Sequence, residues 1–511
     1  MRLKIYQLLV FAILISPLRG QSQQTAFSML INGSTEIRAV CENMDGNYVA
    51  TGYTFSGNQA NATIMEISPT GDILQQNVFG STATELPYAV VQASAGYYLV
   101  TGSMYDNFND YDWFVAKLDS ALQIVWFKRM GAVSGNDYSN SCFEVSPDHF
   151  VVTGTVGLLG SAKPSVVLID SSGSVLQQGY LNTNQFASPN YRGRYLGNGE
   201  VAFANLATAI AVLDTSGNLV KQSSFNVATY TRDIRLAPNG SYAICGVAGF
   251  GGPQGSSIAF AITDSTLSNT LLLKKFNQNG LDLSVVSMEA ETGGNYVLAV
   301  NATGLSSGNT APVLIKIDSL GNLISAKSYL PLGFQNVMIQ SMIKSSDGSY
   351  LIVGGSGTTG FIAKVDSANS CFFSPLSLAT NTLVNLPATP HSTVSGTINI
   401  INPQVNSIAT GTQSPNYLCN PSSIEEADET MNNVIIYPTL TDDWLHVTLK
   451  NTDARAFQME VFQNTGKLVM TKIIYPPTDV DISELAHGIY FCRFKDFTHE
   501  LSSSARFLKV K

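Results

Sequence analysis

The sequence predicts an all-β protein in which a seven-bladed β-propeller is followed by a small β-sandwich of immunoglobulin-like type. Three observations support this fold class. A short motif recurs seven times, short apolar runs show almost no helical periodicity, and the strand pattern changes near residue 431. The chain has 511 residues, of which 44% are apolar and 13% charged, enough for two or three buried cores.

The first 20 residues have the pattern of a secretory signal peptide. Arg2 and Lys4 precede an apolar run, and small or turn-forming residues follow up to Gly20. A membrane anchor would need about 20 apolar residues, and Pro17 and Arg19 end this run too early. We therefore expect export through the Sec translocon, with cleavage near Gly20, and no transmembrane segment in the mature chain.

The repeated motif is a turn followed by an aromatic residue that opens a strand. The clearest copies contain Tyr48, Tyr98 and Phe150, and in each the strand leads to a Thr-Gly pair. The seven anchor positions are 48, 98, 150, 201, 242, 296 and 350, spaced by about 41 to 54 residues, the period of a propeller blade. Each repeat predicts four strands: A before the turn, B after it, C ending at an Asp turn such as Asp119, and D beyond.

The two ends of the repeat array predict how the ring closes. Blade seven has no evident strand D after Asp366, whereas residues 25–32 have the pattern of a strand D and precede blade one. We expect these residues to pair with blade seven, so that no sheet edge is left open there. The propeller is then predicted to span residues 21–370.

The repeats resemble the secreted propeller repeats of bacteria that use the type IX secretion system. Residues 112–119, Asp-Trp-Phe-Val-Ala-Lys-Leu-Asp in blade two, match that pattern best, and blade four departs from it most. The resemblance covers about residues 25–370 and implies the fold but no ligand.

The segment 371–430 separates the propeller from the last domain. It begins at Cys371, contains Cys419, is rich in Pro, Thr and Ser, and ends in the acidic run 425–429. A disulfide between these two cysteines would close a long loop and reduce the entropy of the unfolded chain. The alternative is two unpaired thiols.

Residues 431–511 form short alternating strands, as a small β-sandwich requires. Their markers resemble the type A sorting domain of the type IX system, although Thr439 and Leu440 replace the usual Asn-Pro after Tyr-Pro. The resemblance implies recognition by the type IX secretion machinery and a mature protein outside the cell or attached to its outer surface. A structural sandwich without a sorting role is the alternative. The residues that carry the markers are Tyr437, Pro438, Gly466, Lys467, Asp481, Gly488, Tyr490 and Lys509.

The mouth of the central channel is the predicted ligand site, because the B–C and D–A loops on that face are long and variable. Strand A should start near the mouth about ten residues before each anchor. A ring of polar side chains there could hold a polar ligand or only water. The candidate ligand-binding residues are Arg38, Tyr88, Asn140, Tyr191, Arg232 and Gln340, with Val286 as the apolar member of the ring.

A secreted polysaccharide-degrading enzyme is the alternative to a binding protein. It would need two carboxyl groups about 5 to 9.5 Å apart at the mouth. No motif identifies such a pair or any other catalytic residue, and only Trp113 and Trp126 are available in the propeller to stack on sugars. The candidate acids are Glu36, Glu85, Asp137, Asp233 and Asp282.

One loop in blade two collects oxygen ligands of the kind that Ca²⁺ prefers. Its spacing is not that of an EF-hand, and a solvated acidic loop is the competing interpretation, so we expect no obligatory cofactor. The candidate residues are Asp106, Asn109, Asp110 and Asp112.

Composition limits the partners. The net charge of −9 leaves no broad basic surface to attract a nucleic acid backbone. The sequence therefore predicts a secreted or cell-surface propeller, more consistent with a binding or adhesion protein than with an enzyme. Its extracellular ligand, a glycan or a protein, is not specified by the sequence.

Overall fold

The chain divides into two compact units, Met1–Leu418 and Cys419–Lys511. The computed structural model describes residues 26–31, 35–57, 59–105, 111–131, 135–158, 161–182, 193–197, 199–204, 209–224, 230–237, 239–249, 255–305, 309–329, 336–356, 359–365, 373–375, 378–382, 392–394, 399–401, 406–407, 415–419, 434–437, 440–441, 443–449, 456–463, 468–475, 477–486 and 488–496, and 502–509. The predicted signal peptide, residues 1–20, therefore lies outside the described residues.

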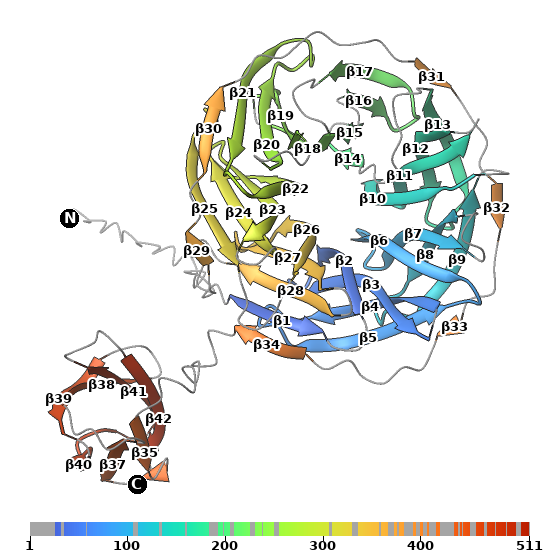
Figure 1. Cartoon of the computed structure of the whole chain (residues 1–511). Helices are drawn as coiled ribbons and strands as arrows, with labels where there is room; N and C mark the ends of the chain where they lie inside the picture. Colours follow the sequence, from blue (N-terminus) through green and yellow to red (C-terminus); the bar gives the residue numbers. More distant parts are fainter. Residues whose placement is uncertain are drawn as a thin grey trace, which may run out of the picture. The chain divides into compact units, whose positions relative to one another are not determined.

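The first unit is a ring of seven antiparallel sheets with strands A to D from the centre outward, and in the first six blades these four strands follow one another in sequence (Figure 1). Blades one to four are β2 (Thr35–Glu42), β3 (Tyr48–Ser56), β4 (Gln59–Ile67) and β5 (Ile73–Gly80); β6 (Thr84–Gln92), β7 (Tyr98–Tyr105), β8 (Tyr111–Leu118) and β9 (Ile124–Gly131); β10 (Tyr138–Ser146), β11 (His149–Leu158), β12 (Ser161–Asp170) and β13 (Val175–Asn182); and β14 (Gly193–Tyr195), β15 (Glu200–Ala204), β16 (Ala209–Asp214) and β17 (Leu219–Ser224).

Blades five and six continue the pattern, and blade seven is assembled from both ends of the repeat array. Blades five and six are β18 (Tyr230–Leu236), β19 (Tyr242–Ala248), β20 (Ser257–Thr263) and β21 (Thr270–Asn277); and β22 (Asp282–Ala290), β23 (Tyr296–Leu305), β24 (Asn309–Ile317) and β25 (Leu323–Tyr329). Blade seven contains β26 (Met338–Lys344), β27 (Tyr350–Gly355), β28 (Gly360–Val365) and β1 (Phe27–Ile31). The seven-bladed fold is as the sequence predicted.

The N-terminal strand closes the ring. β1 pairs antiparallel with β28, so that Phe27 lies opposite Lys364 and Ile31 lies opposite Gly360. All five residues of β1 are buried. The prediction that residues near 25–32 supply the missing strand D of blade seven is confirmed.

A belt of six short strands follows blade seven and pairs with the outer strands of the propeller. We expected the segment 371–430 to lie between the domains, but its first part adds a fifth strand to blades six, five, three, two, one and seven, in that order (Figure 1). The belt strands are β29 (Phe373–Pro375), β30 (Ala379–Thr382), β31 (Ser392–Val394), β32 (Asn399–Ile401), β33 (Asn406–Ser407) and β34 (Pro415–Cys419).

The belt covers sheet edges that would otherwise offer unpaired backbone groups. β30 pairs with β21, β32 with β9, and β34 with β1. Among the described residues, the outer strand β17 of blade four has no fifth strand. Covered edges hinder strand addition by another chain.

The cores lie between neighbouring blades, and the anchor tyrosines explain why the motif repeats. Each cluster combines residues of two adjacent blades, as where Val49 and Phe79 of blade one meet Val100 and Phe114 of blade two. Several anchor hydroxyls also reach the preceding blade. The hydroxyl of Tyr350 donates to Glu291 (2.8 Å), and that of Tyr48 lies 3.0 Å from the hydroxyl of Ser345. The apolar ring of the tyrosine fills the gap between two blades, and its hydroxyl forms a hydrogen bond with the preceding blade.

Among the described residues, strand A of six blades carries a β-bulge at the same place. There the pairing between strands A and B shifts by one residue, which leaves one residue of strand A without a partner on strand B. The bulged residues are Arg38, Tyr88, Asn140, Arg232, Val286 and Gln340. In all but blade six, a glycine of strand B pairs with the residue before the bulge: Gly52, Gly102, Gly154, Gly246 and Gly354.

Glycine is required where the two backbones approach this closely. A Cβ on Gly154 would lie 1.9 Å from the carbonyl oxygen of Tyr138, whereas a Cβ on Gly179, in strand D of the same blade, would meet nothing nearer than 3.3 Å. We predict that Gly154→Ala lowers the free energy of unfolding by roughly 1 to 3 kcal/mol, because the bulge must open. Gly179→Ala is the matched control with a smaller effect. Chemical denaturation of the purified chain measures both, and equal effects would argue against the bulge explanation.

The second unit is a β-sandwich of two sheets, as the sequence predicted. One sheet has the order β35 (Val434–Tyr437), β37 (Trp444–Leu449) and β40 (Thr478–Asp481). The other has the order β36 (Leu440–Thr441), β42 (Ser502–Lys509), β41 (Gly488–Asp496), β38 (Phe457–Gln463) and β39 (Leu468–Ile474). Buried side chains from both sheets, including Leu445, Val480, Met459 and Phe494, form one core. Within the described part of the chain, no helix has the length and apolar character needed to cross a membrane.

Candidate functional site

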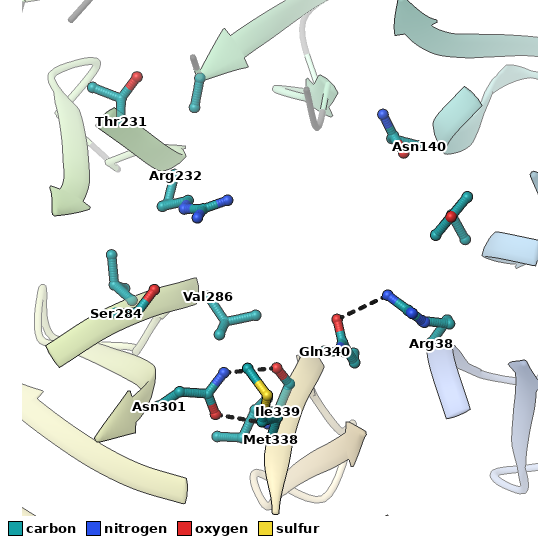
Figure 2. Close-up of a pocket in the computed structure, with 13 residues that line it drawn as sticks. Arg38, Asn140, Thr231, Arg232, Ser284, Val286, Asn301, Met338, Ile339 and Gln340 are labelled. Atoms are coloured by element: carbon teal, nitrogen blue, oxygen red, sulfur yellow. Dashed lines mark hydrogen bonds between the residues drawn. The ribbon is translucent and has the colours of Figure 1, made fainter. Parts of the chain in front are cut away.

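The six bulged residues share one cavity in the centre of the propeller. The bulge turns each extra side chain into the channel, and together these side chains line a volume of about 290 Å³ (Figure 2). Of the six candidate residues, the structure brings together Arg38, Tyr88, Asn140, Arg232 and Gln340. The sixth, Tyr191, lies outside the described residues.

The remainder of the cavity wall comes from residues within two positions of the bulges and from strand B of blades four and six. Asn301 is fixed by the backbone of blade seven, because its amide donates to the carbonyl of Ile339 (3.0 Å) and its carbonyl accepts from the N–H of Ile339 (2.7 Å). The other lining residues are Ala204, Thr231, Ser284, Val285, Met338 and Ile339 itself. The described wall is therefore mostly polar.

Arg38 has its charge balanced within the propeller. Its Nη2 lies 3.1 Å from Oε1 of Glu36, and its Nη1 donates to the amide oxygen of Gln340 (3.3 Å). The guanidinium also lies over the rings of Tyr53 and Tyr88, 5.4 and 5.6 Å from their centroids. Figure 2 shows Arg38 and Gln340 directed toward each other across the boundary between blades one and seven. Arg38 is thus held in place as part of the wall.

Arg232 differs from Arg38, because no described carboxylate pairs with it. Its guanidinium carbon lies 5.3 Å from the centroid of the Tyr230 ring, and its buried Nε, like that of Arg38, has no hydrogen-bond partner among the described residues. Burial lowers the pKa of Arg232, and the nearby Tyr230 offsets this lowering only in part. Figure 2 shows the side chain directed into the cavity. The cavity therefore contains a cation without a counter-charge in the described structure.

The five candidate acids have structural partners instead. Glu85 accepts from the N–H of Ser81 (2.9 Å), Asp137 from that of Gly157 (2.6 Å), and Asp282 from that of Ser256 (2.7 Å). Glu36 accepts from Gln340 (3.2 Å) as well as binding Arg38. None of the described lining residues is an acid.

The fifth acid, Asp233, is the centre of a network that joins three blades. It binds Arg194 of blade four and Arg235 of its own strand, each at 2.8 Å, and accepts from the N–H of Met288 in blade six (2.9 Å). Arg235 continues the network to Glu289 (2.7 Å). Burial alone would raise the pKa of Asp233, but the two arginines hold it below its usual value. This carboxylate has a structural role.

The candidate calcium loop receives little support from its one described member. Asp112 is buried and forms an ion pair with Arg129 of the neighbouring strand. Asp106, Asn109 and Asp110 lie outside the described residues. Within the described part of the chain, no cluster of three or more acidic, histidine or cysteine side chains could hold a metal ion. Cys371 and the side chain of Cys419 are likewise outside it, so the disulfide remains an expectation.

Sequence reasoning missed a row of aromatic side chains beside the cavity. Tyr105 and Tyr111 have ring centroids 4.5 Å apart, and Tyr111 and Tyr138 have centroids 5.0 Å apart. With Tyr88, which lines the cavity, we call these four residues the tyrosine row; all are partly exposed. A tyrosine on each side of the loop 106–110 was the signal available in the sequence.

The tryptophans considered for sugar stacking are unsuited to this site. Trp113 is fully buried, and its indole N–H donates to the carbonyl of Thr155 (2.9 Å). Trp126 donates to the carbonyl of Ser171 (3.1 Å), in the C–D turn of blade three at the opposite end of the strands. Accessible aromatic surface at the mouth comes from tyrosine instead.

The described markers of the C-terminal unit lie in its strands and turns. The Asp481 carboxylate accepts from the N–H of Ser483 (2.9 Å), and the Tyr490 hydroxyl donates to the carbonyl of Ala486 (2.8 Å). Lys509 is buried and lies 2.8 Å from Asp443. Gly488 begins β41, and Tyr437 pairs with His446 in β37. Pro438, Gly466 and Lys467 lie outside the described residues.

The fold defines this chain as a β-propeller protein with a C-terminal β-sandwich. Residues 435–506 match the family model of the secretion system C-terminal sorting domain. The protein therefore carries the sorting domain of the type IX system and is secreted or attached to the cell surface.

Solved structures similar to this chain include several propellers. Sqt1 from Chaetomium thermophilum is 9% identical, over 65% of this chain and 97% of that chain, with a TM-score of 0.41. The WD40 repeats of RRP9 are 13% identical, over 67% and 99%, with a TM-score of 0.44. BamB from Moraxella catarrhalis is 12% identical, over 66% and 97%, with a TM-score of 0.37. No match is found among curated proteins.

Proposed function

We propose that this protein is a non-catalytic binding module that acts outside the cell and receives an anionic group of its ligand in the central cavity of the propeller. The observation that carries the proposal is Arg232, a partly buried cation directed into the cavity with no described carboxylate partner. A guanidinium binds carboxylate or sulfate through two parallel hydrogen bonds.

Other arginines of the propeller make the contrast clear. Arg38 pairs with Glu36, Arg129 with Asp112, and Arg194 and Arg235 share Asp233. Removing a cation from water is unfavourable unless an opposite charge or hydrogen bonds compensate for it. An anion in the cavity would supply both to Arg232.

The geometry favours binding over hydrolysis. A polysaccharide-degrading enzyme would place two carboxyl groups about 5 to 9.5 Å apart around the substrate. The described cavity wall contains no carboxyl group, and the nearby acids Glu36 and Asp233 bind arginines. Amide, hydroxyl and guanidinium groups suit recognition of a polar ligand.

The proposal predicts that sulfate stabilises the propeller through Arg232. We expect the free energy of unfolding to rise by about 1 kcal/mol when the sulfate concentration is about five times its Kd, relative to sodium chloride of equal ionic strength. Arg232→Gln should abolish this rise. Lys275→Gln, which removes one positive charge from the outer strand β21, should preserve it. Thermal unfolding of the full-length chain measures the effect, and equal stabilisation of the Arg232→Gln variant would refute the proposal.

A further inference from the structure

The tyrosine row leads from the cavity to strands B and C of blade two and to the start of strand A of blade three. Tyr88 belongs both to the cavity and to the row, while Tyr105 and Tyr111 end and begin the two strands that flank the B–C loop of blade two. Tyr138 begins strand A of blade three. A ligand that reaches Arg232 can therefore continue over aromatic surface without leaving this face of the propeller.

The tyrosines offer flat faces and neutral hydroxyl groups. Burial raises the pKa of Tyr138 to about 12, with neighbouring Tyr111 and Tyr88 acting in the same direction. Burial also raises the pKa of Tyr111. At neutral pH these phenols are therefore protonated, so each ring combines an apolar face with a hydroxyl that can donate and accept hydrogen bonds.

We propose that the ligand is an extended acidic glycan, with sugar rings stacked on the tyrosine row and a carboxylate or sulfate group bound by Arg232. This inference rests on the proposed function and adds the class of ligand. A sugar ring has an apolar face of C–H groups and a rim of hydroxyls. That pattern matches half-buried tyrosines beside a wall of amides such as Asn140 and Gln340.

An extended peptide fits these observations less well. Peptides commonly bind β-sheets by adding a strand to an open edge, with side chains placed in pockets. The belt occupies the outer edges of six blades, and the described cavity wall is mostly polar. An acidic peptide is therefore the competing outcome of the experiment.

The test measures binding of oligogalacturonate, a neutral gluco-oligosaccharide of the same length, and polyglutamate to the full-length protein by calorimetry. Of these three compounds, we expect only oligogalacturonate to bind well. Tyr111→Ala should weaken this binding by about fivefold to tenfold, because the lost stacking corresponds to about 1 to 1.4 kcal/mol. Tyr111→Phe should bind as the wild type does, since the ring face is retained.

The controls separate this inference from the proposed function. Tyr97→Ala removes a partly exposed tyrosine from the A–B turn of blade two, at the opposite face, and should leave binding unchanged. Tyr111→Ala should keep the stabilisation by sulfate, whereas Arg232→Gln should lose both effects. If Tyr111→Ala unfolds, Tyr138→Ala takes its place. The glycan inference would be overturned if polyglutamate bound with equal strength, or if neither Tyr111→Ala nor Tyr138→Ala weakened the binding of oligogalacturonate. The sulfate experiment tests the proposed function separately.

Discussion

Deletion of residues 21–33 is expected to prevent the propeller from folding stably. The deletion removes β1, and Phe27, Met29, Leu30 and Ile31 all have no solvent exposure. Burial of a large apolar side chain contributes about 1.5 to 3 kcal/mol, so the four together contribute about 6 to 12 kcal/mol as an upper estimate. That is comparable with the whole stability of a typical domain, about 5 to 15 kcal/mol.

The loss would also expose two strands. β28 would lose its outer partner, and the belt strand β34 would lose the strand on which it lies. We expect the truncated protein to aggregate and to lose its cooperative thermal transition, measured by calorimetry and light scattering. Deletion of residues 21–24 alone is the control and should have little effect. A peptide of residues 25–33 added during refolding should restore the transition; a truncated protein that melts like the intact one would contradict this account of ring closure.

Much of the propeller could be predicted from the sequence because its blades repeat. The tyrosine anchors recur where a ring must fill the gap between blades, and the Thr-Gly pair recurs where a bulge brings two backbones together. Counting ten residues back from the anchor therefore found the bulged side chains that line the cavity. The closing strand β1 could be inferred because blade seven lacked a partner that the other blades have.

The belt could not be predicted from the same signals. Its strands have two to five residues, too few for an alternating pattern to be recognised, and each depends on a blade far away in the sequence. The segment has no repeat, because each strand meets a different outer edge. Composition alone indicated only a segment between domains.

The sequence also did not show which arginine of the cavity is paired with a carboxylate. Arg38 and Arg232 occupy equivalent bulges and looked alike as candidate ligand-binding residues. Only the structure shows that Arg38 is balanced by Glu36, two residues earlier in the same strand, while Arg232 has no described counter-charge. Asp233, the residue after Arg232, binds Arg194 and Arg235 instead.

Replacement of Asp233 by asparagine is expected to have the second largest effect on stability. The carboxylate is 5% exposed and binds two arginines that belong to blades four and five, with a further hydrogen bond from blade six. Removing one partner from a buried ion pair destabilises a protein by about 3 to 5 kcal/mol, because the remaining charge is buried without compensation. We therefore expect Asp233→Asn to lower the free energy of unfolding by this amount at pH 7. Asp282→Asn, at an exposed carboxylate, should change it by less than about 1 kcal/mol.

The pH dependence gives an independent test of the same network. The folded-state pKa of Asp233 is depressed by Arg194 and Arg235, so its contribution is present above the unfolded pKa of about 3.9 and is lost as the pH falls through the folded value. The difference in unfolding free energy between the wild type and Asp233→Asn should therefore be constant from pH 7 to about 5 and shrink below about pH 4. Denaturation curves at a series of pH values measure it. A difference that stayed the same at pH 3 would show that packing around residue 233, and not the ionised carboxylate, holds the three blades together.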